Sequence, residues 1–258
     1  MPIDYQKEGH VAIFTINRPE VRNALSPEML AEWTEALIDF RENKDLWVGI
    51  ITGAGDRAFC AGLDLRSAGP SSGQTGQAAR PSAPQDTLVR GLELWKPLIA
   101  AINGYALGGG FEITLACDIR IAADTAQMGL TEVTLGLMPG WGGTQRLPRM
   151  IPFSLAAEMI IMGKRITAQE ALEIGLVHQV VPLKDLMATA KARAEKICES
   201  APLAVQGVKE AMIRGYSMTL EDGLKLETEI GRKVLASKDF AEGRKAFMEK
   251  RKPEYKGE

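Results

Sequence analysis

The chain has 258 residues, of which 45% are hydrophobic and 25% charged, as is typical of globular proteins and not of disordered or fibrous ones. The net charge of -2 provides no overall positive field for nucleic acid or for an anionic membrane. Cysteine and histidine are too few and too scattered for a structural zinc centre or a multi-histidine metal site, so we expect no metal.

The amino terminus and the apolar runs bear on where the protein resides. The first ten residues include acidic side chains and no apolar segment typical of a signal peptide. The longest apolar runs are shorter than the roughly 20 residues that a membrane span needs. We therefore expect a soluble, cytoplasmic protein that binds neither membranes nor nucleic acid.

The first half of the chain alternates strand-like and helix-like segments. Strands are predicted at 11–16, 47–52, 98–102 and 119–122 from their short apolar, β-branched runs. Ser26 and Pro27 are a helix cap and a first-turn proline, and they predict a helix to about Arg41. This alternation indicates an α/β fold with a mostly parallel sheet. Between the strands, Ser67–Gln85 is rich in Gly, Ser, Pro, Ala and Gln and is interpreted as a surface loop.

The carboxyl-terminal part has no strand pattern after about residue 183. Helices are predicted at 183–200, 202–214, 220–236 and 240–250, several of them amphipathic. Because a helix must bury its apolar face, we expect these helices to cover the core or another subunit. The sequence thus predicts an α/β core at 1–195 and a helical oligomerisation region at 196–258.

Two glycine-rich turns follow predicted strands. The segment 53–58 matches the G-x-G-x-x-A pattern of dinucleotide-binding turns, but no amphipathic helix follows and no acid lies about 20 residues on, so we reject that function. The segment Gly108–Gly110 stands between a strand and an apolar helix at 111–117. Free amides at such a helix start can bind an anion or a developing oxyanion, although a tight structural turn explains the glycines about equally well.

Two acidic residues are candidates for acid–base chemistry. Glu112 lies in the first turn of the apolar helix, and Glu132 lies on a short segment in mostly apolar surroundings. Two carboxylates in one cavity can divide acid and base roles if their environments separate their pKa values. The sequence alone leaves open whether the two side chains meet, since each also has an ordinary structural explanation.

Taken together, these segments resemble the enoyl-CoA hydratase/isomerase (crotonase) superfamily, and most closely its two-glutamate hydratases. The similarity runs over nearly the whole length. It is carried by the segments NRP (17–19), NAL (23–25), AFCAGLDL (58–65), ALGGGFE (106–112) and LGLMPGWGGTQRL (135–147), which occur in this order.

The resemblance implies a fold, an assembly and a substrate. The fold would be a crotonase-like spiral of ββα repeats, with carboxyl-terminal helices that form trimers or dimers of trimers. The substrate would be an acyl-CoA thioester, so coenzyme A would be part of the substrate and no separate cofactor would be needed.

The resemblance also implies site residues. Glu112 and Glu132 would be catalytic, with the amides of Leu63 and Gly109 as an oxyanion hole. The CoA and substrate contacts would be Arg22, Ala24, Ala61, Leu63, Asp64, Leu65, Gly108, Gly109 and Trp141, with Phe247 and Lys250 reaching the CoA of a neighbouring subunit.

The implied reaction is reversible hydration of a 2-enoyl-CoA to a 3-hydroxyacyl-CoA. Glu112 would activate the water and Glu132 would protonate C2, or both could hold one water and share the transfers. The alternatives are an enoyl-CoA isomerase, which needs one carboxylate near position 132, and another crotonase-type acyl-CoA lyase. RNA binding, which some relatives combine with hydration, is disfavoured by the acidic balance. Trp141 either narrows the acyl pocket or packs in the core.

Overall fold

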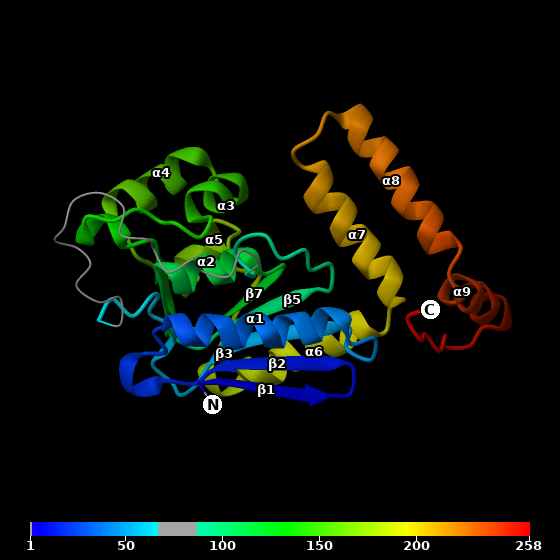
Figure 1. Cartoon of the computed structure of the whole chain (residues 1–258), viewed down its shortest axis with the longest axis horizontal. Coiled ribbons are helices and arrows are strands. Elements are labelled where there is room, and N and C mark those ends of the chain that lie inside the picture. The colour runs from blue at the N-terminus through cyan, green and yellow to red at the C-terminus, as the bar shows by residue number, and fades with distance from the viewer. Residues whose placement is uncertain (1, 67–86) are drawn as a thin grey trace.

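The computed structural model describes residues 2–66 and 87–258. Its strands form two sheets (Figure 1). The six-stranded sheet has the order β1 (Ile3–Glu8), β2 (Val11–Ile16), β3 (Val48–Gly53), β5 (Leu98–Ile102), β7 (Ile119–Ala123), β10 (Gln179–Val181). The four-stranded sheet has the order β4 (Ala58–Cys60), β6 (Tyr105–Leu107), β8 (Gln127–Gly129), β9 (Ile166–Thr167).

The strands repeat one connection. In each of the pairs β3–β4, β5–β6 and β7–β8, the first strand enters the larger sheet and the next enters the smaller one. All pairings among β3, β5 and β7, and among β4, β6 and β8, are parallel. This repetition is the predicted spiral of ββα units, and the α/β fold class is confirmed.

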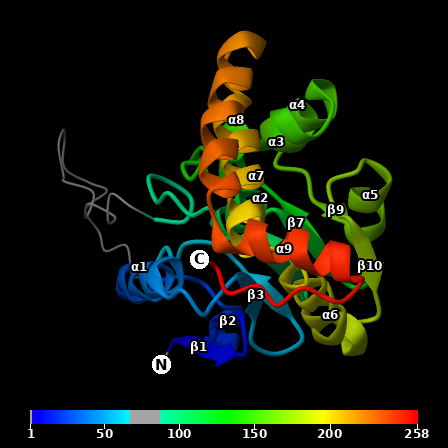
Figure 2. The same ribbon diagram turned by 90° about the vertical axis from the view of Figure 1, so that its right-hand side faces the viewer.

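The described helices lie on both faces of the larger sheet and beyond it. They are α1 (Pro27–Glu42), α2 (Gly109–Ala116), α3 (Gly143–Met150), α4 (Phe153–Met162), α5 (Ala168–Glu173), α6 (Leu186–Cys198), α7 (Pro202–Gly215), α8 (Leu220–Leu235) and α9 (Lys238–Glu249), with short 3₁₀ helices η1 (Pro19–Val21), η2 (Glu132–Leu135) and η3 (Leu183–Asp185). Figure 2 shows α1 and α6 on opposite sides of this sheet. The core between the layers contains the fully buried rings of Phe14, Phe40, Phe59 and Phe111.

The predicted segments agree with the structure apart from their ends. Ser26 caps α1 by accepting a hydrogen bond from the Met29 amide, with Pro27 in the first turn. The turn after β3 leads into strand β4 and not into a helix, which agrees with the rejected dinucleotide-binding pattern. The predicted loop Ser67–Gln85 lies outside the described residues.

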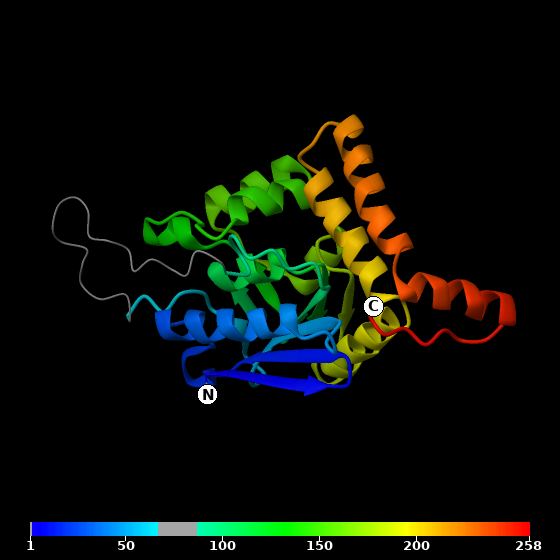
Figure 3. The same cartoon turned by 45° about the vertical axis from the view of Figure 1, so that its right-hand side comes forward.

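The last helices extend from the core. α7 and α8 pack side by side as a hairpin that stands away from the sheets, and α9 lies across its base (Figures 2 and 3). α6 instead packs on β3, β5 and β7. It ends at Cys198, so the predicted boundary at residue 195 falls in its last turn, and the division into two regions stays a prediction.

None of the described helices is both long and apolar enough to cross a membrane.

Candidate functional site

Two chain turns meet at the amino terminus of α2. Leu63 forms a parallel bridge with Leu25, in which Leu25 donates to the Gly62 carbonyl (2.8 Å) and Asp64 donates to the Leu25 carbonyl (2.8 Å). The bridge uses the Gly62 carbonyl and the Asp64 amide, on either side of Leu63, so the amide of Leu63 itself points away from Leu25. A Cβ built on Gly62 would lie 3.2 Å from the Gly109 nitrogen, which places the turn before Leu63 directly beside that of Gly109.

Two glycines make this close approach possible. Gly62 has φ +93° and Gly108 has φ +53°, in the left-handed region that side chains other than glycine rarely adopt. A side chain at Gly62 would also meet the Leu107 carbonyl at 3.0 Å. Among the described residues the amides of Leu63 and Gly109 have no hydrogen-bond acceptor, so both are free to bind an oxygen.

Glu112 is fixed by main-chain donors. Its side chain is 2% exposed, and its Oε1 accepts hydrogen bonds from the amides of Trp141 (2.7 Å) and Gly143 (2.8 Å). Burial raises the pKa of Glu112, and the two amides together with the charges of Arg146 and Arg90 oppose that rise. In the described part of the chain, no hydrogen bond engages Oε2, which leaves this atom to hold a water molecule.

Glu132 lies at the same helix start in a different environment. A Cβ built on Gly108 would lie 3.4 Å from its Oε1, so the carboxyl group faces the first turn of α2. Its Oε2 is buried and has no hydrogen-bond partner among the described residues. Burial raises the pKa of Glu132 to about 7, against the opposing effect of its own backbone amide and with a further contribution from the negative charge of Glu112. The two glutamates therefore meet in one site, and their surroundings differ.

The predicted CoA-contact residues form a strip that ends at the amides of Leu63 and Gly109. The Ala61 amide donates to the Arg22 carbonyl (3.0 Å), and Asn23 Nδ2 ties the same turn to the carbonyls of Ala54 (3.0 Å) and Ala58 (2.7 Å). This pairing brings together Arg22, Ala24, Ala61, Leu63, Asp64 and Leu65. The Asp64 carboxylate is buried and accepts hydrogen bonds from Arg18 (3.3 Å) and from the Arg66 amide (3.2 Å), so within the subunit it orders the strip.

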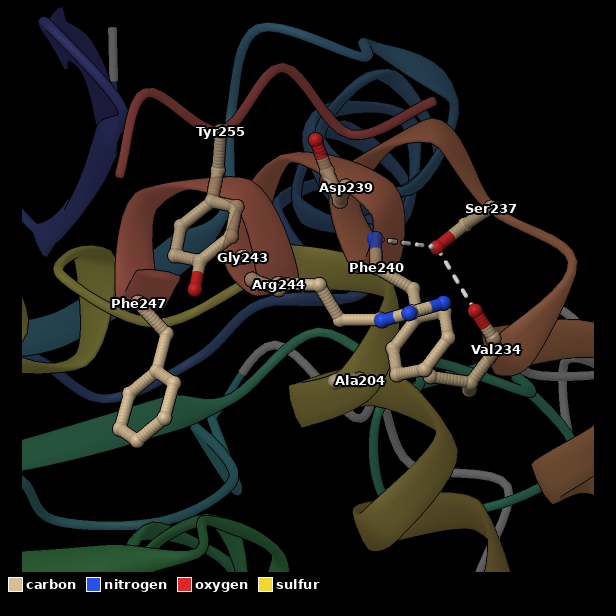
Figure 4. Close-up of a pocket in the computed structure, with 10 residues that line it drawn as sticks. Ala204, Val234, Ser237, Asp239, Phe240, Gly243, Arg244, Phe247 and Tyr255 are labelled. Carbon is tan, nitrogen blue, oxygen red and sulfur yellow. Dashed lines mark hydrogen bonds between the residues drawn. The ribbon is translucent and has the colours of Figure 1, made fainter. Parts of the chain in front are cut away.

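The structure does not bring Phe247 and Lys250 to this site. They lie at the end of α9, which is well separated from α2 in Figures 1 and 3. Phe247 also lines a cavity of about 300 Å³ between α7, α8, α9 and the last residues (Figure 4). Two of the polar side chains there have structural partners: Ser237 Oγ accepts from the Phe240 amide and donates to the Val234 carbonyl, and Asp239 accepts from the amides of Lys256 and Gly257.

Sequence reasoning missed what holds Glu112 in place. The amides of Trp141 and Gly143 come from the turn before α3, and Arg146, one turn further, fixes that turn by donating to the Trp141 carbonyl (2.9 Å). The consecutive glycines at 142 and 143, just before a helix, could have indicated these amide donors, since they resemble the Gly108–Gly110 turn. Among the described residues, no three His, Cys, Asp or Glu side chains group as metal ligands would.

The fold and this site match one family. The family model for enoyl-CoA hydratase/isomerase matches residues 6–258, and the chain belongs to that family. The chain is 43% identical to (E)-benzylidenesuccinyl-CoA hydratase of Thauera aromatica, covering all of both chains. It is 42% identical to the short-chain-enoyl-CoA hydratase of Clostridium acetobutylicum, covering 96% of this chain and 95% of the relative.

A solved structure gives the same result for the fold. The crystal structure of the enoyl-CoA hydratase from Bacillus anthracis superimposes with a TM-score of 0.93 at 45% identity, covering all of both chains. The crotonase fold and the family assignment are thus confirmed, and the chain is an enzyme of the hydratase/isomerase family.

Proposed function

We propose that the protein is an enoyl-CoA hydratase that adds water reversibly to a 2-enoyl-CoA to give a 3-hydroxyacyl-CoA. The observation that carries this proposal is the contrast between two carboxyl groups beside one pair of free amides. Glu112 has a carboxylate oxygen held by two amides, whereas Glu132 has a pKa of about 7 and an unpartnered oxygen. A pair with separated environments suits one base and one acid.

The proposed reaction uses each group once. The amides of Leu63 and Gly109 bind the thioester oxygen and stabilise the charge that it gains in the transition state, where one such donor is typically worth roughly 10²–10³ in rate. A water at Glu112 Oε2 attacks C3 and gives its proton to Glu112. Protonated Glu132 gives its proton to C2, so that H and OH are added across the C2–C3 bond. Glu112 then loses its proton to solvent and Glu132 takes one up, which restores the starting state. The CoA belongs to the substrate, and the steps need no further cofactor.

The related enzymes support a CoA thioester and leave the acyl group open. One relative is named for a short-chain enoyl-CoA and another for an aryl-substituted one. A double-bond isomerase is the alternative within the family, which covers both activities. It would use Glu132 alone to move a proton, and the second buried carboxylate would then have no role.

An oligomer is part of the proposal. Large apolar side chains on the α7–α8 hairpin are exposed, among them Met212, Tyr216 and Leu220, and such a surface is typical of an interaction site. We propose a homotrimer or a dimer of trimers in which this hairpin is covered. Phe247, with 85% of its side chain exposed, and Lys250 would then contact the CoA of a neighbouring subunit.

The test is a panel of short, long and aryl-substituted 2-enoyl-CoA substrates, followed by the loss of absorbance of the conjugated thioester. Glu112→Gln and Glu132→Gln should each lower kcat by about 10²–10⁴, the usual worth of a general acid or base. Glu227→Gln, the same change at an exposed glutamate of α8, is the matched control and should behave as wild type.

Two outcomes would contradict the proposal. Near-wild-type hydration by either variant would exclude the two-carboxylate mechanism. Loss of hydration in Glu112→Gln together with full conversion of 3-enoyl-CoA to 2-enoyl-CoA would establish an isomerase instead.

A further inference from the structure

The indole of Trp141 lies directly against the oxyanion amide. A Cβ built on Gly109 would lie 2.7 Å from Cζ3 and 2.8 Å from Cε3 of the indole. The main-chain nitrogen of the same residue donates to Glu112 (2.7 Å). The ring of Trp141 therefore borders the position of the thioester oxygen, while its backbone holds the base.

The same indole also lines a small cavity. This cavity of about 20 Å³ lies between α1, α2 and residues 87–89, and its wall is formed mainly by Leu30, Trp33, Leu37, Leu88, Val89 and Ile113. The hydroxyl groups at its edge are already used, since Thr34 donates to the Leu30 carbonyl and Thr87 to the Arg90 carbonyl. A space of this size holds about one water molecule and no alkyl chain.

We propose that Trp141 closes the far end of the acyl pocket and restricts the enzyme to short acyl groups. A longer acyl chain enters the cavity behind Trp141 when the side chain at position 141 is small. This inference rests on the proposed function only in placing a thioester oxygen at the amides of Leu63 and Gly109. An acyl chain that runs from that oxygen past Glu112 meets Trp141, because Trp141 contacts both Gly109 and Glu112.

The chemistry of the wall sets the expected effect. Each methylene of the ligand that moves from water into a largely apolar cavity increases the affinity of the ligand by about fourfold. Trp141→Ala keeps the amide that binds Glu112 and removes only the ring. A gain for long chains is therefore the expected consequence, even where the overall rate falls.

The experiment measures the dissociation constants of butyryl-CoA and decanoyl-CoA by calorimetry. In Trp141→Ala the ratio of the two constants should shift at least tenfold towards decanoyl-CoA, and Trp141→Phe should shift it less. Val89→Phe in the Trp141→Ala background fills the cavity from its opposite wall and should return the ratio to within about threefold of wild type. Circular dichroism and thermal melting identify folded variants, and Trp141→Phe alone suffices if Trp141→Ala does not fold.

Saturated thioesters cannot be hydrated, so the result does not depend on the reaction. A ratio within twofold of wild type in the folded Trp141 variants overturns the inference, as does a gain that Val89→Phe leaves in place. Binding without turnover of any enoyl-CoA overturns the proposed function alone, whereas failure of the wild type to bind either thioester overturns both.

Discussion

Glu112 and Glu132 are the same residue type at one helix start, and their neighbours decide how they differ. Two amide donors favour the ionised form of Glu112, and burial opposes it. For Glu132, burial and the charge of Glu112 both raise the pKa, its own backbone amide opposes them, and the pKa of its carboxyl group rises to about 7. The group with less support for its charge is the one that can carry a proton near neutral pH.

The first prediction concerns the pH dependence of the rate. If Glu132 must be protonated to act on C2, kcat/KM for hydration should fall above about pH 7, by roughly tenfold for each further pH unit. Initial rates with crotonyl-CoA between pH 5.5 and 9 would measure this. A constant kcat/KM up to pH 9, or the same inflection in the residual activity of Glu132→Gln, would rule out Glu132 as the acid.

The second prediction concerns stability. The folded pKa of Glu132 is raised above its unfolded value of about 4.5, so the folded state binds more protons and loses stability as the pH rises from about 4.5 to 7. Glu132→Gln removes this loss. The melting temperature of the variant should therefore exceed that of wild type by more at pH 8 than at pH 5, as measured by calorimetry. An equal difference at both pH values would mean that Glu132 titrates alike in both states.

Among the elements, the contact between α2 and β4 sets the position of the Gly109 amide. A Cβ built on Gly110 would lie 2.0 Å from the Cys60 carbonyl oxygen, and Gly110 follows directly after Gly109. Only glycine lets the helix start this close to the strand that leads to Leu63. The position of the Gly109 amide therefore depends on this packing contact.

The third prediction tests this contact. Gly110→Ala should cost about 1–3 kcal/mol of stability through overpacking, and a lowering of the melting temperature by several degrees would record it. Hydration should fall as well, because the Gly109 amide moves. Gly231→Ala in α8 is the matched control, since a Cβ there meets nothing within 4 Å and alanine favours a helix. A wild-type melting temperature in Gly110→Ala would refute the explanation.

The sequence predicted elements well where one periodicity governs a segment. The buried runs at 11–16, 98–102 and 119–122 became β2, β5 and β7, and Ser26 with Pro27 marked the start of α1. The short strands β4, β6 and β8 were not predicted, because three residues carry too little pattern. Strand β1 was not predicted either: it lies at the sheet edge, pairs with β2 alone among the described strands, and exposes much of its polar sequence.

The site was only partly predictable for a similar reason. The glycines before Glu112 indicated free amides, because the effect of glycine at the start of a helix depends on neighbouring residues in the sequence alone. The meeting of Glu112 with Glu132 depends on β6 and β8 lying side by side in the smaller sheet, which is a long-range fact. The residues themselves made both glutamates candidates, and the family resemblance joined them as a pair. The different pKa environments became visible only with the packing.

At the scale of the whole molecule, the α7–α8 hairpin buries little of its apolar surface. Met212, Tyr216 and Leu220 expose two thirds or more of their side chains. Polar and charged groups such as Lys225 and Glu229 lie on a different side of α8 from Leu220. One side of the hairpin is thus suited to a second protein surface and another to water.

The fourth prediction concerns assembly. Met212→Asp places a charge on the apolar side and should dissociate the proposed oligomer, which light scattering would detect as a lower molar mass. If Phe247 and Lys250 act across subunits, the KM for the CoA substrate should rise in parallel. Glu229→Lys also alters a charge on the hairpin and is the control that should keep the wild-type mass. A monomeric wild type would contradict the assembly outright.

The two contacts of Trp141 have a consequence for how this protein could change over generations. The atom that holds Glu112 belongs to the main chain, so every amino acid except proline supplies it at position 141. The ring that we propose to border the acyl pocket belongs to the side chain, so a substitution can change the ring and keep the amide. Mutation at this codon can therefore alter what the enzyme accepts while preserving how it reacts. Paralogues with new substrates could arise here in single steps, whereas proline alone would remove both properties.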